Sequence, residues 1–267
     1  MIFAGTTVPG GAGENEDWLA ATPDLVVVLD GATVRTETGC HHGPAWYTRK
    51  LGAAIIAAAA DRQLTLGEIL STAIAEVTQL HPECDLTRPG APSAGVAIVR
   101  DEGTVLRYLV LGDITIAADV AAGIKVISDD RVSSTALAER AAADRHLIGT
   151  PEKAAALIKM KEIELAAQNH DGGYWIASAD PTVVDHAIAG EFRTDDLRQF
   201  ALLSDGAARL VTGFGFISWD QALDLLATAG PAELINRTRA AEEADPLGER
   251  YPRNKKSDDA TVVYARI

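Results

Sequence analysis

The stretch Leu25-Val26-Val27-Val28-Leu29-Asp30-Gly31 is an apolar run that ends in a carboxylate and a glycine. It predicts a short buried strand over 24–29, with Asp30 at the point where the strand meets solvent. Two other apolar segments carry acidic residues at one end. The run 200–204 leads into Asp205-Gly206, and Asp258-Asp259 comes directly before the run 260–265. In an antiparallel sheet the end of one strand lies beside the start of its neighbour, so these carboxylates can meet at one edge.

A fourth acidic motif, Glu16-Asp17, lies upstream of the first run. Carboxylates that gather without Lys or Arg repel one another, and hard divalent cations are the usual remedy. Each Asp-Gly pair taken alone is a common hairpin signal. However, no complementary strand follows Asp30-Gly31 at once, and residues 207–211 after Asp205-Gly206 look helical. We therefore interpret these motifs as more than turns.

Size and charge limit the classes of function. The chain has 267 residues and no Pro- or Ser-rich linker, which favours a single domain over 1–267. It carries 38 acidic and 24 basic residues, a net charge of -14, so nucleic acid is not an expected partner. No signal peptide pattern or membrane-spanning stretch is evident, and we expect a cytoplasmic protein with no membrane partner.

Hydrophobic periodicity and turn residues predict the remaining elements. A capping box of Thr65 and Glu68 is expected to begin a helix over 66–80. The other expected helices cover 44–61, 137–143, 151–168, 219–227 and 232–243. The expected strands cover 93–100, 104–111, 114–118 and 124–127 as one meander, then 174–177, 200–203 and 261–266. Helices segregated from mostly antiparallel strands indicate the α+β class.

Five acidic motifs, in the order in which they occur along the chain, resemble those of the metal-dependent type 2C protein phosphatase (PPM) family. The chain looks like a divergent bacterial-type member. The resemblance runs from about residue 14 to the C-terminus. The matching pieces are Asn15-Glu16-Asp17, Val27-Val28-Leu29-Asp30-Gly31, Val110-Leu111-Gly112-Asp113, Leu203-Ser204-Asp205-Gly206 and Ser257-Asp258-Asp259-Ala260-Thr261-Val262-Val263.

The resemblance implies a fold and a cofactor. The fold would be an αββα sandwich of two mostly antiparallel sheets flanked by helices, with a flap-like helical segment over 131–170. The cofactor would be two Mg2+ or Mn2+ ions, bound by oxygen ligands that suit hard cations. Asp30 would be the central catalytic position, because it would bridge the two ions, and water activated by them would be the nucleophile.

The other site residues implied by the resemblance surround Asp30. Glu16 and the Gly31 carbonyl would help to hold one ion, and Asp205 and Asp258 would hold the other. Asp17 would contact these ligands and would not bind the ions directly. Asp113 matches a position that can help to hold a weaker third ion.

The sequence also departs from the family pattern. Residues 9–13 contain no Arg to grip the substrate phosphate, Ala32 stands where some members have a His, and Ile114 replaces a Ser. Five other basic residues can substitute for the missing Arg: Arg35, Arg49, Lys50, Lys255 and Lys256. Each of them is more typical of a solvated surface charge.

Other motifs have weaker functional signals. Cys40 and Cys84 are the only cysteines and form no Cys-x-x-Cys pair, so we interpret them as structural or incidental thiols. His41-His42 do not have the spacing of a helical zinc pair and are interpreted as a loop feature. The chain has no phosphate-binding P-loop and no Gly-x-Ser-x-Gly hydrolase motif.

The resulting hypothesis is a Mg2+/Mn2+-dependent phosphomonoesterase that acts on phosphoserine or phosphothreonine in a phosphorylated protein. One alternative, motivated by the missing Arg, is a phosphatase for a small phosphorylated metabolite. A third hypothesis belongs to another class: a catalytically weak homologue that acts as a binding or regulatory protein through the same cleft.

Overall fold

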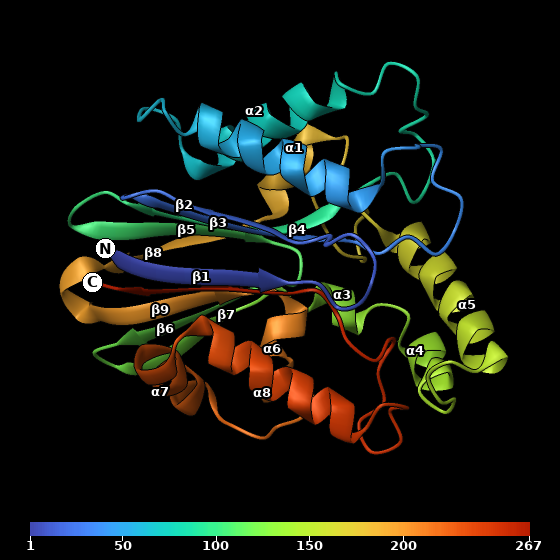
Figure 1. Ribbon diagram of the computed structural model, residues 1–267. Helices are drawn as coiled ribbons and strands as arrows, with labels where there is room; N and C mark the ends of the chain where they lie inside the picture. Colours follow the sequence, from blue (N-terminus) through green and yellow to red (C-terminus); the bar gives the residue numbers. More distant parts are fainter.

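Two antiparallel sheets of five strands pack face to face, and helices cover both outer faces (Figure 1). The computed structural model describes residues 1–267. The expected α+β class and the αββα sandwich implied by the family resemblance are both confirmed. No helix combines the length and the apolar character needed to cross a lipid bilayer.

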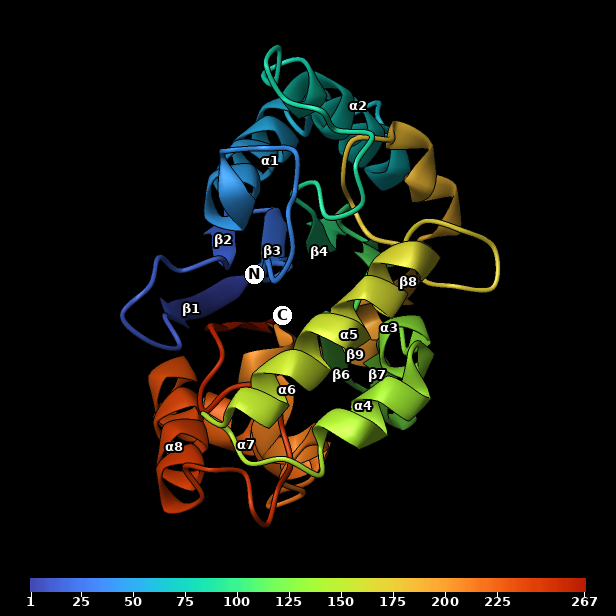
Figure 2. The same ribbon diagram turned by 90° about the vertical axis from the view of Figure 1, so that its right-hand side faces the viewer.

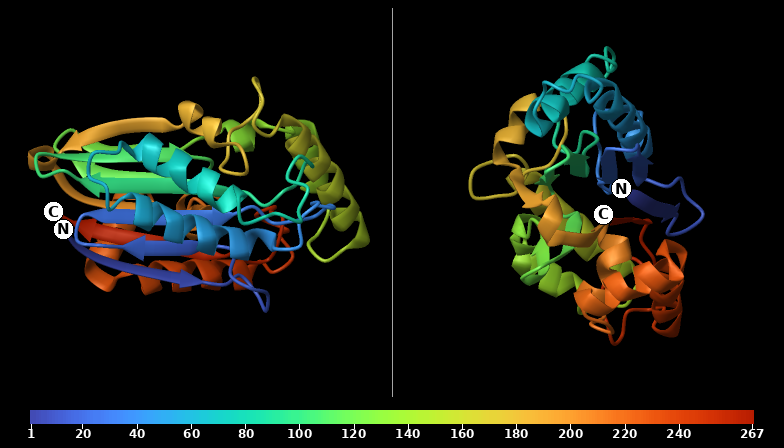
Figure 3. Two further views of the ribbon diagram at one scale, coloured as in Figure 1. Left: turned by 90° about the horizontal axis from the view of Figure 1, so that it is seen from above. Right: turned by 90° about the vertical axis from the view of Figure 1, so that its left-hand side faces the viewer.

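The first sheet contains the two terminal strands. Its strand order is β1 (Ile2–Val8), β10 (Ala260–Arg266), β9 (Leu197–Leu203), β6 (Thr115–Val120) and β7 (Gly123–Ile127). The outer face of this sheet packs against α6 (Asp205–Thr212), α7 (Trp219–Ala229) and α8 (Pro231–Ala244). Both termini lie at the same end of the sandwich (Figure 3), because β1 and β10 pair with Ile2 opposite Arg266.

The second sheet contains the opening apolar run. Its strand order is β2 (Trp18–Ala21), β3 (Leu25–Gly31), β4 (Ala94–Asp101), β5 (Val105–Leu111) and β8 (Ile188–Arg193). Helices α1 (Gly43–Ala58) and α2 (Leu66–Thr78) cover its outer face, together with the short 3-10 helix η1 (Pro181–His186). The capping box of Thr65 and Glu68 is present at the start of α2, as the sequence predicted.

Strand β3 explains why the opening run has no polar residue. Its side chains alternate between two cores. Val26 and Val28 lie in the core between the sheets, whereas Leu25, Val27 and Leu29 lie in the core beneath α1 and α2. A central strand that is covered on both faces requires apolar residues at every position.

Two predictions about strands are wrong. The four strands over 93–127 do not form one meander, because β4 and β5 belong to one sheet and β6 and β7 to the other. The chain changes sheets at Gly112, which has a φ of +85°. The segment 174–177 is not a strand and makes only isolated bridges, such as that between Ala177 and Ala94.

A small helical unit lies beyond one end of the two sheets. It consists of the short helix α3 (Arg131–Ser134), α4 (Leu137–Ala143) and α5 (Pro151–Ala167), and Thr150 is the N-cap of α5. Helix α5 crosses in front of this end of the sandwich (Figure 2), opposite the two termini (Figure 3). The helices expected over 137–143 and 151–168 are therefore present.

Candidate functional site

Four of the predicted acidic residues line one pocket at the end of the sandwich beside α5. The pocket has a volume of about 150 Å3 and is lined by Asp30, Asp113, Asp205 and Asp258, among others. Asp30 lies at the end of β3, Asp205 is the first residue of α6 directly after β9, and Asp258 comes just before β10. The backbone N–H of Asp205 lies 3.4 Å from Asp30 Oδ2. Strand ends from both sheets therefore bring these carboxylates together.

The glycines after Asp30 and Asp205 permit close backbone approach rather than hairpin turns. A Cβ atom at Gly31 would lie 2.6 Å from the Glu16 carbonyl oxygen. A Cβ atom at Gly206 would lie 2.0 Å from the Asp259 carbonyl oxygen. Both distances are too short for any side chain, so each glycine lets an acidic motif from elsewhere in the chain pack against it.

Asp17 and Glu16 are not among the residues that line the pocket, although the Glu16 backbone packs against Gly31, which does line it. Asp17 is 5% exposed, and neither of its carboxylate oxygens has a hydrogen-bond partner. Burial raises the pKa of Asp17 to about 7. Glu16 Oε2 accepts a hydrogen bond from Thr33 Oγ1 at 2.7 Å, and burial raises the pKa of this carboxyl group as well. A buried carboxylate without a partner is costly unless a cation is present.

The carboxyl groups inside the pocket are perturbed in the same direction. The surrounding protein desolvates Asp30 and raises its pKa well above the ordinary value, and repulsion from Asp17 and Asp205 adds to this effect. Asp205 is open to the cleft, yet desolvation on its other sides and repulsion from Asp258 raise its pKa to about 8. Desolvation also raises the pKa of Asp113. Clustered oxygen donors of this kind fit hard divalent cations such as Mg2+ or Mn2+.

Asp258 differs from the other acidic residues because it is already paired with cations. Its Oδ1 lies 2.5 Å from Lys255 Nζ, and its Oδ2 accepts from Arg209 at 3.1 Å. Lys255 Nζ also lies 3.0 Å from Thr33 Oγ1. The pocket therefore has a side formed by the carboxyl groups of Asp30, Asp113 and Asp205, and another side where the Asp258 carboxylate is already paired with cations.

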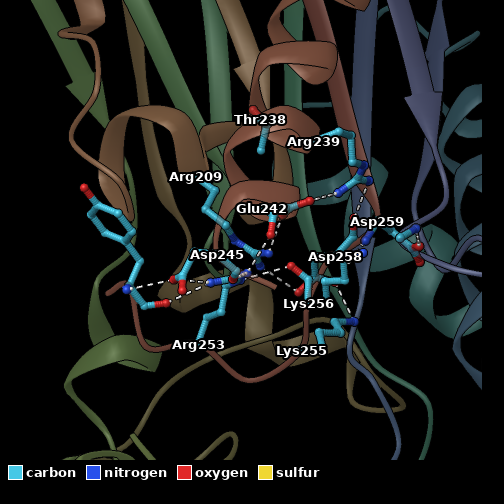
Figure 4. A network of polar contacts seen from close by, with 12 residues as sticks. Arg209, Thr238, Arg239, Glu242, Asp245, Arg253, Lys255, Lys256, Asp258 and Asp259 are labelled. Atoms are coloured by element: carbon cyan, nitrogen blue, oxygen red, sulfur yellow. Dashed lines mark hydrogen bonds and ion pairs between the residues drawn. The ribbon is translucent and has the colours of Figure 1, made fainter. Parts of the chain in front are cut away.

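A buried polar network fixes the backbone and side chain of Asp258 (Figure 4). The Glu242 carboxylate is fully buried and accepts from Arg209 and from Arg239, each at 2.8 Å. Arg239 also donates to the Asp258 carbonyl oxygen. The Asp259 carboxylate does not face the pocket, because it accepts the backbone N–H groups of Gly10 and Glu16, each at 2.7 Å. This network connects α6, α8 and the start of β10 and fixes their relative positions.

The structure separates the basic residues that the sequence suggested as phosphate contacts. Arg35 and Lys255 line the pocket. The other three do not line it, because Arg49 lies beside Glu14, Lys50 lies over the Trp46 ring, and Lys256 pairs with Glu243.

Two further basic residues in the pocket were not identified from the sequence. Arg140 and Lys161 come from α4 and α5, and both contact Glu164, at 2.6 Å and 3.6 Å. Their helices show no local signal that they cross a site. Among the four basic residues that line the pocket, only Arg35 forms no ion pair.

The sequence matches no known family model and no curated protein. Comparison of structures does find relatives. The serine/threonine phosphatase PstP/Ppp of Mycobacterium tuberculosis is 16% identical, with coverage of 100% of this chain and 98% of that chain and a TM-score of 0.57. A PstP catalytic domain in complex with two manganese ions is 17% identical, with coverage of 99% and 97% and a TM-score of 0.55. The serine/threonine phosphatase Stp1 of Staphylococcus aureus is 14% identical, with coverage of 99% and 94% and a TM-score of 0.59. At these identities the likeness establishes the shared fold.

Proposed function

We propose that this chain is a divergent member of the metal-dependent type 2C phosphatase family and hydrolyses phosphate monoesters as a single domain over 1–267. The observation that carries the proposal is the cluster of four aspartates in one pocket, three of which, Asp30, Asp113 and Asp205, are desolvated. The fold shared with serine/threonine phosphatases supports the same activity.

The cofactor would be two divalent cations, Mg2+ or Mn2+. Asp30, the Gly31 carbonyl and Glu16 would hold one ion, and Asp30, Asp205 and Asp258 would hold the other. Asp113 would contribute to a third. The repulsion of Asp30 by Asp205, Asp113 and Asp258 supports this donor set, and the buried, unpartnered carboxylate of Asp17 beside it supports a cation nearby. When bound, the ions supply Lewis acidity that neutralises charge on the phosphate and activates water. A relative with two manganese ions supports the choice of cation.

The residues of the chain would orient the substrate around this centre. Arg35 would grip the phosphate, because its guanidinium is the pocket cation that has no carboxylate partner. Lys255 would keep Asp258 and Thr33 in place through its contacts at 2.5 Å and 3.0 Å. The flap-like segment over 131–170 would narrow the entrance, since Met160, Lys161 and Glu164 of α5 line the pocket.

The substrate would be phosphoserine or phosphothreonine in a protein, as the names of the structural relatives suggest. A purified sample should hydrolyse a generic aryl phosphate with Mn2+ and lose this activity with a chelator. Asp30→Ala should abolish turnover, whereas Asp195→Ala, at an exposed position away from the pocket, should not. Full activity of the Asp30 variant would overturn the proposal.

Two further measurements separate the alternatives. Turnover on a panel of phosphopeptides, compared with a panel of phosphorylated metabolites, distinguishes a protein phosphatase from a small-molecule phosphatase. Calorimetric titration with Mn2+ tests the third hypothesis, because a binding protein that has lost its catalytic centre would show neither metal binding nor turnover.

A further inference from the structure

Two loops that are far apart in the sequence lie side by side next to the pocket. One loop, 32–42, connects β3 to α1, and the other, 79–93, connects α2 to β4. The Asp85 backbone N–H donates to the Gly39 carbonyl at 3.0 Å. A Cβ atom at Gly39, whose φ is +70°, would lie 2.6 Å from the Asp85 carbonyl oxygen. This close approach brings the side chains of Cys40, His41 and His42 to Cys84.

The sulfur and nitrogen atoms of these side chains converge. His42 Nδ1 lies 3.4 Å from Cys40 Sγ and 3.5 Å from Cys84 Sγ. His41 Nδ1 lies 3.6 Å from Cys84 Sγ. The ligand atoms of Cys40, His42 and Cys84 all lie within 4.8 Å of one another. A tetrahedral zinc ion, with bonds of about 2.3 Å to sulfur and about 2.0 Å to nitrogen, holds these ligand types about 3.5 Å apart.

We propose that Cys40, Cys84 and His42 bind a structural zinc ion. His41 lies outside this group of three but has its Nδ1 3.6 Å from Cys84 Sγ, and it would turn toward the ion to complete the tetrahedron. Two cysteines and two histidines form the closed tetrahedral set of structural zinc sites. Thiolate and imidazole ligands select zinc, whereas the carboxylate pocket suits Mg2+ or Mn2+. The two sites are therefore chemically distinct, and the zinc site does not depend on the proposed phosphatase activity.

The surroundings of the ligands are suited to a metal site. The His42 backbone N–H donates to Cys40 Sγ at 3.4 Å, a contact that stabilises a thiolate. The His42 ring packs against the rings of Trp46 and His81, with centroids 4.1 Å and 4.9 Å away, which fixes its orientation. Cys40, His42 and Cys84 are half-buried, and His41 is exposed, so an ion can reach the site.

The zinc ion would pin one end of a loop that also lines the pocket. Thr33 and Arg35 lie in the 32–42 loop and face the pocket, and Cys40 and His42 lie at its far end, before α1. Because 42 residues separate His42 from Cys84, the ion would close a long segment of chain. It would thereby hold Arg35 in the position from which it can contact an anion.

The experiment measures zinc in the full chain, purified without chelator and supplied with equimolar Zn2+. We expect about one tightly bound zinc ion per chain. Cys40→Ser and Cys84→Ser should each lose it, whereas the double variant Asp30→Asn, Asp205→Asn should keep it, because the carboxylate pocket is not involved. Replacement by Co2+ should give the intense visible bands of a tetrahedral site together with thiolate charge-transfer absorption.

A second measurement uses the unaltered protein, so that it does not depend on how the cysteine variants fold. Titration with an organomercurial reagent should release zinc to a coloured indicator in step with modification of two thiols. Three results would overturn the proposal. These are a protein that binds no zinc, zinc that remains in both cysteine variants, and a denatured protein without free thiols, which would indicate a Cys40–Cys84 disulfide.

Discussion

Replacing Asp17 with Asn should remove one distinct contribution to the pH dependence of stability in the metal-free protein. The Asp17 side chain is buried without a hydrogen-bond partner, and this burial raises its pKa from 3.8 to about 7. The folded state therefore binds this proton more tightly than the unfolded state does. The stability that protonation contributes is fully present below about pH 4 and is lost as the pH rises through about 7.

The size of the effect follows from the shift in pKa. Each unit corresponds to about 1.4 kcal/mol, so ionised Asp17 costs on the order of 4 kcal/mol in the folded state. Between about pH 4.5 and about pH 8, Asp17 should lower the free energy of unfolding by about 3 kcal/mol. In Asp17→Asn this contribution is absent at both pH values. Any constant cost of burying the amide cancels, because the comparison is between two pH values of one variant.

Urea unfolding in the presence of a chelator, at these two pH values, measures the difference. From the lower to the higher pH, the free energy of unfolding should fall by about 3 kcal/mol more in the unaltered protein than in Asp17→Asn. Asp195→Asn is the matched control, because the Asp195 side chain is 89% exposed. The same pH dependence in the Asp17 variant and the unaltered protein would refute the argument.

Three further outcomes are expected. Mn2+ should raise the melting temperature more at about pH 8 than at about pH 5. At the lower pH, protons compete with the cation for the carboxyl groups whose pKa values are raised. Scanning calorimetry at both pH values measures the difference. Glu242→Gln should lower the free energy of unfolding by about 3 kcal/mol in urea denaturation, since it removes the buried charge that pairs with the half-buried Arg209 and Arg239. Glu233→Gln, in an exposed pair with Arg237, should change it by less than about 0.5 kcal/mol. Arg35→Ala should lower kcat/KM for a phosphomonoester by about 10- to 100-fold, which corresponds to the loss of one charge-assisted hydrogen bond. An unchanged kcat/KM would exclude Arg35 as the phosphate contact.

Local patterns in the sequence predicted the buried elements well. Strands β3, β4, β5, β9 and β10 are apolar on faces that pack into the cores, and α1, α2 and α5 begin within one residue of their expected starts. Strands β1, β2 and β8 were not predicted. Each lies at the edge of a sheet and keeps mostly half-buried or exposed residues, so its sequence lacks a strong hydrophobic alternation.

The acidic part of the pocket was accessible to sequence reasoning because position along a strand determines where its end lies. Asp30, Asp205 and Asp258 were expected to meet, and they line one pocket. The basic residues were not accessible in the same way. Arg140 and Lys161 lie on helices whose placement over the pocket depends on packing between distant segments.

The sequence alone determined the α+β class, the buried central strand at 25–31 and the clustering of acidic residues at strand ends. Hydrophobic periodicity is a pattern within a few neighbouring residues, so it can be recognised in the sequence of a single segment. Only the tertiary structure decided that Asp258 pairs with Arg209, and that His42 approaches Cys84. These contacts join segments far apart in the chain, and they depend on how the two sheets, their helices and their loops pack together.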